Sequence, residues 1–194
     1  MTATARLRPD DSRQAWPTLQ GLIKTNGLLL SADGKNFDLA SGRKSHFLFD
    51  IKPIALDPIG SNLIAELILE TIDKDTSDFI GGMETGAIPI VSAVVVRSKE
   101  ICPLPGFFVR KQAKERGTKR RVDGNLAPGS TAVLLDDVTT TGGSVLEAVD
   151  VVRNFGCFVS QVITVVDRLE GARENLAAAG IELTALFTKE DFGL

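Results

Sequence analysis

Residues 133–143 read VLLDDVTTTGG and place two aspartates, three threonines and two glycines directly after an apolar run. The apolar residues predict a buried strand, TAVLLDD at 131–137, that brings Asp136 and Asp137 to its carboxyl end. The segment GGSVLEAVDVVRNFG follows with helical spacing of its apolar residues, so we expect a helix to begin near Gly143. A strand that leads through a short loop into a helix is typical of an α/β protein.

The rest of the chain repeats this alternation of strand and helix. Further strands are predicted at SDFIGG (77–82), FFVRK (107–111), CFVSQVITVVD (157–167) and IELTALF (181–187), and further helices at 57–72 and 172–180. The segment IPIVSAVVVRS (88–98) reads as a helix, although its valines also suit a strand. Alternation of this kind predicts an α/β fold with a central, mostly parallel sheet flanked by helices.

The beginning of the chain has a different pattern. An amphipathic stretch at about 11–25 precedes two short extended pieces, GLLLSADG and NFDLASG, which a turn signal around Asp33 and Gly34 separates. These pieces predict a small N-terminal hood at about 11–55 on a core at about 56–190. With 194 residues, of which 43% are hydrophobic, hood and core are expected to form a single domain.

Composition restricts the chemistry and the partners. The net charge of -3 gives no global attraction to nucleic acid or to a membrane surface, and no apolar run approaches the roughly 18 residues of a membrane span. The first residues lack the apolar centre of a signal peptide, and the two cysteines fit no metal or redox spacing, so a cytoplasmic location is expected. With one histidine and no tyrosine, the chemistry must use carboxylates, Lys, Arg, hydroxyls and backbone amides.

The loop TTTGGS at 139–144 has the composition of a phosphate site. Glycines let successive N–H groups point at one anion, and the following helix adds the positive end of its dipole. Because carboxylates repel phosphate, Asp136 and Asp137 suit sugar hydroxyls or a hydrated Mg²⁺ better. A phosphorylated ribose satisfies both halves. The alternative is that the aspartates only end a strand and cap the next helix.

A second polar stretch, FVRKQAKERGTKRRVDG at 108–124, contains seven Lys or Arg residues among few apolar ones. It is predicted to be a mobile loop, because it has little with which to bury itself. Such a loop can neutralise the charge of a departing pyrophosphate and exclude water. The alternative is an ordinary solvated basic loop.

The string VLLDDVTTTGGSV resembles the 5-phosphoribosyl 1-pyrophosphate (PRPP) binding motif of type I phosphoribosyltransferases. The resemblance implies the fold of that superfamily and Mg²⁺ as cofactor, bound mainly through PRPP and water near Asp136 and Asp137. It also implies a catalytic role for Asp137. The PRPP contacts it implies in this motif are Asp136, Asp137, Val138, Thr139, Thr140, Thr141, Gly142, Gly143 and Ser144.

The basic stretch resembles one family of that superfamily, orotate phosphoribosyltransferase, whose RKxxKxHG pattern supplies PRPP contacts and a catalytic lysine. Arg110, Lys111 and Lys114 match this pattern, and Arg116 stands where the family usually has histidine. Three more segments are similar to family motifs: SGRKSHFLFD (41–50) to SGRKSPYYFD, GGMETGAIPI (81–90) to ETGGIPL, and VVDRLEGA (165–172) to DRxEGA. The resemblance implies PRPP contacts from the four basic residues, catalysis by Lys114, and a homodimer in which each loop serves the neighbouring subunit's site.

The orotate half of the site is expected after the strand that ends at Asp167. Arg168 leaves this strand on the ligand side, and its guanidinium fork suits the carboxylate that distinguishes orotate from uracil. An ordinary surface arginine is the alternative. Thr140 is expected at the edge of the pyrimidine.

Other residues near these motifs have more than one interpretation. Glu84 and Thr85 can place backbone amides against pyrophosphate, or Glu84 can serve only to stabilise a turn. Phe49 can lie against the base or pack in the core, and His46 is expected to be structural.

These features predict Mg²⁺-dependent transfer of a 5-phosphoribosyl group from PRPP to orotate, which gives orotidine 5'-phosphate and pyrophosphate in de novo pyrimidine (UMP) biosynthesis. Two alternatives stay open. Ala40 and Leu48, which replace a lysine and an aromatic residue found in the family, and Arg116 leave room for another base. A non-catalytic PRPP-binding regulator would keep the cradle, but the chain has no apparent DNA-binding segment and keeps the full basic loop.

Overall fold

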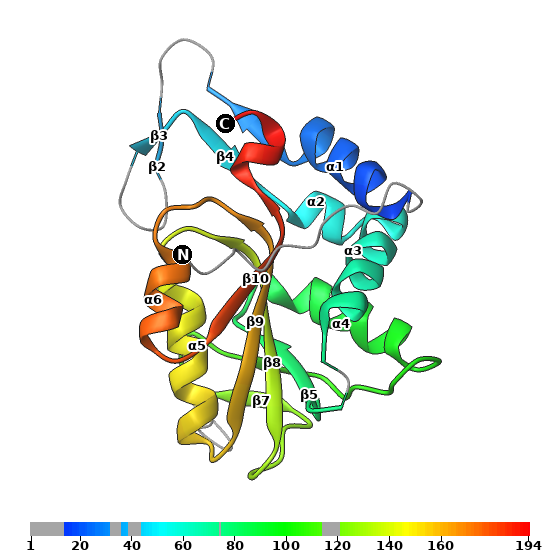
Figure 1. Cartoon of the computed structure of the whole chain (residues 1–194), viewed down its shortest axis with the longest axis vertical. Coiled ribbons are helices and arrows are strands. Elements are labelled where there is room, and N and C mark those ends of the chain that lie inside the picture. The colour runs from blue at the N-terminus through cyan, green and yellow to red at the C-terminus, as the bar shows by residue number, and fades with distance from the viewer. Residues whose placement is uncertain (1–13, 32–35, 39–43, 74, 114–120) are drawn as a thin grey trace.

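The computed structural model describes residues 14–31, 36–38, 44–73, 75–113 and 121–194, and at its centre lies a four-stranded parallel sheet. The strand order is β10–β9–β8–β5, with the bounds Glu182–Thr188, Phe158–Asp167, Thr131–Thr139 and Phe79–Gly82 (Figure 1). Val162 of β9 is in register with Leu134 of β8 on one side and with Leu183 of β10 on the other. The predicted parallel sheet is therefore confirmed.

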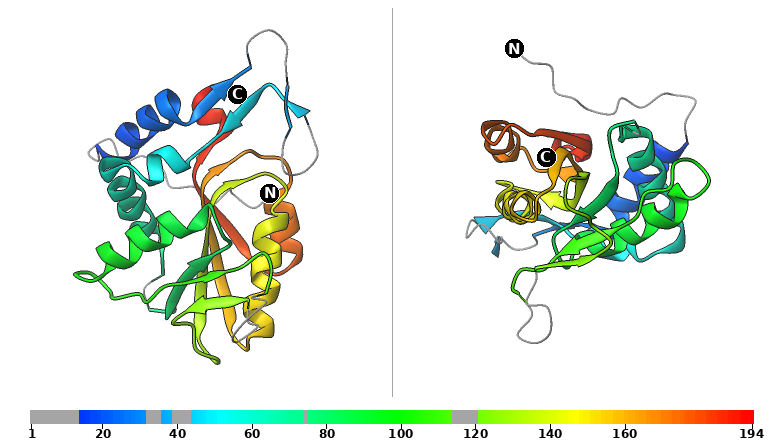
Figure 2. Two further views of the ribbon diagram at one scale, coloured as in Figure 1. Left: turned by 180° about the vertical axis from the view of Figure 1, so that it is seen from behind. Right: turned by 90° about the horizontal axis from the view of Figure 1, so that it is seen from below.

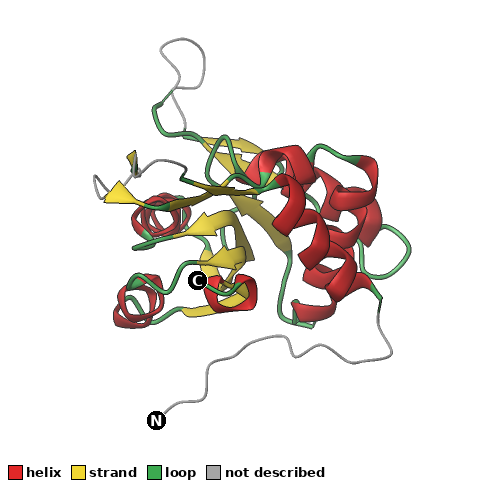
Figure 3. Ribbon diagram, turned by 90° about the horizontal axis from the view of Figure 1, so that it is seen from above, coloured by secondary structure: helices red, strands yellow, loops and turns green. Residues whose placement is uncertain are grey.

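Helices cover both faces of this sheet. α3 (Pro58–Thr71) and α4 (Ala87–Ser98) lie on one side, and α5 (Gly143–Asn154) and α6 (Ala172–Ala178) on the other (Figures 2 and 3). Alternate residues of β8 enter two hydrophobic clusters: Val133 and Leu135 pack with α3 and α4, and Leu134 packs with α5. This is why the strand is apolar throughout: each face of the sheet is buried.

Residues 88–98, whose valines suited either a helix or a strand, lie within α4. The buried residues of α4 include Ala87, Ile90, Val91 and Val94, which recur at helical spacing and form one stripe against the sheet. Tertiary burial of this stripe outweighs the modest preference of valine for strands.

Strand β8 is longer than expected. It continues to Thr139, so the prediction that it ends at Asp137 was wrong by two residues. The reason is its neighbour: β9 runs to Asp167, and the ladder pairs Val138 with Val166 and Thr139 with Asp167. Asp136 and Asp137 thus lie within the last part of the strand.

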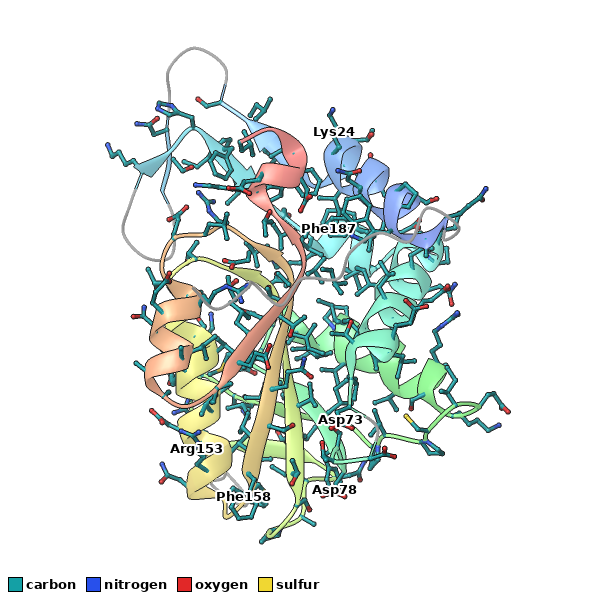
Figure 4. All side chains as sticks on the ribbon, viewed as in Figure 1. Lys24, Asp73, Asp78, Arg153, Phe158 and Phe187 are labelled. Carbon is teal, nitrogen blue, oxygen red and sulfur yellow. The ribbon has the colours of Figure 1, made fainter. Side chains whose placement is uncertain are left out.

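The hood elements lie beyond the carboxyl end of the sheet (Figure 1). They are α1 (Ala15–Asn26), β1 (Leu28–Leu30), β2 (Phe37–Asp38), β3 (Lys44–Ser45), β4 (Phe47–Phe49) and α2 (Lys52–Ala55). β1 pairs with β4 and β2 with β3, both antiparallel. The Trp16 indole packs on Phe187 of β10, labelled in Figure 4, and donates to the Leu186 carbonyl at 3.2 Å. The short helix η1 (Lys189–Phe192) adds Phe192 against Phe49.

Both ends of the basic stretch are strands: the strand predicted at 107–111 is present, whereas the prediction of a mobile loop at 108–124 missed the strand at the other end. β6 (Phe107–Val109) and β7 (Val122–Gly124) pair as antiparallel strands, and bridges from Ile80 to Gly106 and from Met83 to Val109 place β6 beside β5. Apolar residues explain the order, because Phe107 and Val109 are buried. Lys114 and Arg116 lie outside the described residues.

Candidate active site

A cavity of about 300 Å³ lies where β8 leads into α5, at the carboxyl end of the sheet. Its lining brings together most of the predicted motif and adds one residue that the sequence reasoning did not single out, Glu147 of α5. The lining residues are Asp136, Val138, Thr139, Thr140, Thr141, Gly142, Gly143, Ser144 and Glu147. Asp137 is not among them.

The backbone of the loop after β8 is arranged to bind an anion. The carbonyls of Thr139, Thr140 and Thr141 accept from the Arg168 N–H at 3.0 Å, the Ala172 N–H at 3.1 Å and the Asn175 side-chain amide at 2.8 Å. Within the described ranges, no acceptor is found for the N–H groups of Thr140, Thr141 and Gly142. The first N–H groups of α5 have no partner within the helix either. These free donors and the helix dipole form an anion cradle.

Thr139 and the two glycines each have a distinct place in this loop. Thr139 is buried, and its hydroxyl donates to Asp167 Oδ1 at 3.3 Å, so only its backbone is available to a phosphate. Gly142 has a φ of +78°, in the left-handed region that disfavours residues with a Cβ atom. The second glycine of the motif, Gly143, begins α5 with an ordinary negative φ.

Asp136 and Asp137 face different environments. The Asp136 carboxyl lines the cavity, and burial, reinforced by the charge of Asp137, raises its pKa well above the usual range. Asp137 Oδ1 accepts from the Val138 N–H at 3.0 Å, and Oδ2 lies 3.8 Å from Lys52 Nζ. Lys52 comes from the hood helix α2 and was missed in the sequence, because 85 positions separate it from Asp137.

The turn between β5 and α4 touches the same aspartate. A Cβ atom at Gly86 would lie 2.5 Å from the Asp137 carboxyl group, so a side chain at this position would displace that carboxyl group. The peptide bond between Glu84 and Thr85 is cis. The Glu84 carboxylate accepts from the Lys111 N–H at 2.8 Å, and the Glu84 N–H donates to Val109. Glu84 therefore joins this turn to the start of the basic stretch.

The described basic residues at the base of the loop are held by carboxylates. Arg110 lies 3.7 Å from Asp123 of β7, whereas Arg121 donates to Glu147 at 2.6 Å and to the Arg110 carbonyl at 2.9 Å. Lys111 is exposed, and its charge acts to lower the pKa of Asp136 against the larger effect of burial. Arg121 and Glu147 thus tie the loop base to the helix that begins at the cradle.

Arg168 follows β9 directly and is 1% exposed, so the alternative of an ordinary surface arginine was wrong. Its guanidinium donates to Glu170 at 2.8 Å, to the Ser45 hydroxyl at 2.9 Å and to the Phe47 carbonyl at 3.4 Å. Ser45 and Phe47 belong to the hood. The hood therefore covers Arg168, the predicted orotate contact. Thr140, the other predicted contact, lines the cavity and is partly exposed.

The other hood residues have clearer roles. Phe49 is buried, with its ring 5.1 Å from Phe192 and 5.8 Å from Phe47, so it packs in the core. His46 is exposed, and its carbonyl accepts from the Ser31 N–H, in line with a structural role. Leu48 is partly buried, and Ala40 lies outside the described residues.

Comparison with known proteins identifies the family. The phosphoribosyl transferase domain profile matches residues 55–182. Orotate phosphoribosyltransferase from Bradyrhizobium sp. (strain ORS 278) is 45% identical over 159 residues, which cover 79% of this chain and 86% of the relative. This chain belongs to the orotate phosphoribosyltransferase family. The Methanocaldococcus jannaschii member is 44% identical over 155 residues, 80% of this chain and 85% of that protein.

Solved structures support the same assignment. Orotate phosphoribosyltransferase from Mycobacterium tuberculosis H37Rv, in complex with PRPP, superposes with a TM-score of 0.76 at 28% identity and covers 93% of this chain and 99% of its own. The chain thus has the type I phosphoribosyltransferase fold of its family. No helix in the described part of this family member is long and apolar enough to cross a membrane.

Proposed function

We propose that this chain transfers a 5-phosphoribosyl group from PRPP to orotate and releases orotidine 5'-phosphate and pyrophosphate, a step of UMP biosynthesis. The observation that carries the proposal is the cradle: the carbonyls of Thr139, Thr140 and Thr141 are bonded within the protein, and the same loop lines a cavity together with Asp136. An anion-binding loop next to carboxylates suits a ligand that carries phosphate and sugar hydroxyls together. The chemistry is then mainly positioning and charge stabilisation.

The parts of PRPP divide among the elements around the cavity. The 5'-phosphate takes the amides of 140–144, and the ribose hydroxyls donate to Asp136 and Asp137. Pyrophosphate lies toward the turn at 83–86 and Lys111, where Glu84 holds the Lys111 backbone. As pyrophosphate departs, Arg110, Lys114 and Arg116 neutralise the charge that develops on it. Arg110 can do this only if its guanidinium leaves the Asp123 carboxylate, with which it forms an ion pair.

Orotate takes its place beside Arg168 and Thr140. A guanidinium has five N–H donors, and described residues use three of those of Arg168, so within the described part of the chain Nη1 and Nη2 each keep one N–H. These two donors suit the two oxygens of the orotate carboxylate. Because Arg168 is buried under the hood, binding requires Ser45 and Phe47 to move aside or to share the guanidinium.

Mg²⁺ is the cofactor that this chemistry needs. Among the described residues no cluster of three His, Cys, Asp or Glu side chains could hold a metal. Asp136 and Asp137 offer the hard oxygen atoms that Mg²⁺ prefers, and Mg²⁺ is commonly held through phosphates and water with one or two carboxylates. The two aspartates would thus position the metal through its water ligands and through PRPP. When bound, Mg²⁺ neutralises part of the pyrophosphate charge.

The chain acts as a homodimer with shared sites. Leu56, Ile59, Val96 and Ile101 are large hydrophobic residues that are more than half exposed. Leu56, Val96 and Ile101 line an open groove of about 980 Å³ along α3 and α4. A second cavity of about 400 Å³ continues from α4 to the β6–β7 strands. A second copy on this face would bury the apolar groups and bring the base of the basic loop near the neighbouring subunit.

A panel of bases tests the proposal. Product formation is followed with PRPP, Mg²⁺ and, in turn, orotate, uracil, adenine, guanine and hypoxanthine. We expect orotate to give a kcat/KM at least 100-fold above any other base, because only orotate carries the carboxylate that Arg168 would bind. Preference for a different base would not affect the assignment of the fold, but it would show that orotate is not the substrate. PRPP binding without turnover of any base would favour a regulator.

A further inference from the structure

Lys52 is a hood residue with a fixed position at the edge of the active site. It begins α2, and its N–H donates to Asp50 Oδ1 at 3.2 Å. Asp50 is itself held by a hydrogen bond from its N–H to the Gly27 carbonyl at 2.8 Å. Ile51 and Ile54, on either side of Lys52, are buried in the core. The backbone at Lys52 therefore cannot shift without disturbing the attachment of the hood.

The Lys52 ammonium group lies between two carboxylates from different parts of the fold. Nζ is 3.2 Å from Asp50 Oδ1 in the hood and 3.8 Å from Asp137 Oδ2 in β8. Asp137 has little freedom, because Oδ1 accepts from Val138 and the backbone at Gly86 packs against the carboxyl group. With Lys52 at Oδ2, the Asp137 carboxylate is fixed on three sides.

The charges around the cavity make this contact important. PRPP is strongly anionic, and two carboxylates, Asp136 and Glu147, line its expected position, with Asp137 next to Asp136 in β8. Glu147 is paired with Arg121. Burial lowers the pKa of Lys52, but the carboxylates of Asp50 and Asp137 more than offset this and raise it, so Lys52 is a cation at neutral pH. It compensates the Asp137 carboxylate, as Arg121 compensates Glu147.

We propose that Lys52 is a positioning residue for PRPP: it neutralises Asp137 and holds its carboxylate toward the ribose, so that the hood contributes to the PRPP half of the site. This inference rests on the proposed function. It differs from the expected role of the hood, whose described contacts from Ser45 and Phe47 concern the orotate half through Arg168.

Steady-state kinetics of Lys52→Met and Lys52→Arg test the proposal. Methionine keeps the apolar stem and removes the charge, so we expect the PRPP KM to rise roughly three- to fivefold, the scale of one partly exposed ion pair, with the orotate KM within about twofold of wild type. Arginine restores the cation and should keep the PRPP KM within about twofold. Lys24→Met is the matched control, because Lys24 is an exposed lysine of hood helix α1, labelled in Figure 4.

A double-mutant cycle with Asp137→Asn separates this role from a general structural one. If Lys52 acts through Asp137, Lys52→Met should change the PRPP KM by less than about twofold in the Asp137→Asn background. An equal effect in both backgrounds, or a parallel rise in the orotate KM, would overturn the proposal. So would an unchanged PRPP KM in Lys52→Met itself.

Calorimetric titration with PRPP and Mg²⁺, without any base, keeps the two proposals distinguishable. Absence of PRPP binding by the wild-type chain would remove the proposed function. If wild type binds PRPP and Lys52→Met binds it with the same affinity, only the proposed role of Lys52 is overturned. We expect wild type and Lys52→Arg to bind alike and Lys52→Met to bind roughly three- to fivefold more weakly.

Discussion

The guanidinium carbon of Arg168 lies 4.3 Å from the centroid of the Phe47 ring, so a hood residue covers the side chain that leaves β9 toward the ligand. This cation–π contact and the bonds to Ser45 and Glu170 fix the plane of the guanidinium. The same contacts keep Arg168 out of water. A charge held in this way is well placed to recognise one planar carboxylate and costly to leave unpaired.

Arg168→Ala should therefore weaken the binding of orotate far more than the binding of PRPP. We expect the loss for orotate to be on the order of 2 to 5 kcal/mol, the cost of removing one partner from a desolvated charge pair. Separate titrations with orotate and PRPP, together with thermal unfolding to check the fold, measure the difference. Equal losses for both ligands would show that Arg168 supports the whole site and does not select the base.

Asp136→Asn should stabilise the free protein while it reduces activity. Burial and the charge of Asp137 raise the pKa of Asp136, so the folded chain holds this proton more tightly than the unfolded chain does. The free energy of unfolding therefore falls as the pH rises from about 3.8, the ordinary pKa of an aspartate, through the raised pKa of Asp136. Asparagine carries no charge over this range, so the variant does not lose this stability. At pH 7, without PRPP or Mg²⁺, we expect a Tm increase of roughly 2 °C or more.

The pH dependence provides the control for this prediction. The difference in Tm between Asp136→Asn and wild type should shrink as pH falls toward 4, because the wild-type carboxyl then becomes neutral as well. A difference that stays constant with pH would mean that asparagine stabilises by some contact other than the relief of charge. Asp78→Asn, at the opposite end of the sheet from the hood (Figure 4), is the matched change at a carboxyl outside the cavity lining.

Lys114→Ala should reduce kcat by roughly two to four orders of magnitude, the scale of losing one charge contact to the transition state. The shared-site dimer makes a further prediction for mixtures of this chain with an Asp136→Asn, Asp137→Asn chain. Each heterodimer would then contain one site with an intact cradle and an intact loop. Activity per heterodimer should return to as much as half that of the wild-type dimer.

Subunit exchange must be demonstrated for this test, for example with two affinity tags purified in series. If each loop serves its own cradle, both sites of the heterodimer are defective and no activity returns. Purified heterodimers without recovery would rule out shared sites even for a dimeric enzyme.

Much of the fold follows from local sequence pattern. The alternation of apolar strands and amphipathic helices predicts the parallel sheet, because both faces of each strand must be buried. The loop TTTGGS predicts the cradle, because its composition determines which backbone groups are free. The end of β8 could not be predicted in this way, since it depends on how far β9 extends beside it.

The contacts that organise the site are largely invisible in the sequence. Lys52, Gly86 and Arg121 reach Asp137 or Glu147 from three different elements, and only the fold brings them together. The burial of Arg168 has the same origin: Ser45 and Phe47 lie more than 120 positions away in the chain. Pairing of this kind has no periodicity or local composition that would reveal it.

The most direct test of phosphoribosyl transfer at the end of β8 is the rate of orotidine 5'-phosphate formation from PRPP and orotate by the Asp136→Asn, Asp137→Asn chain. We predict that kcat/KM for PRPP falls at least tenfold below wild type, about 1.4 kcal/mol or more of transition-state stabilisation, while the chain remains folded. Turnover close to that of wild type would contradict this site and reduce the two aspartates to a structural role at the end of the strand.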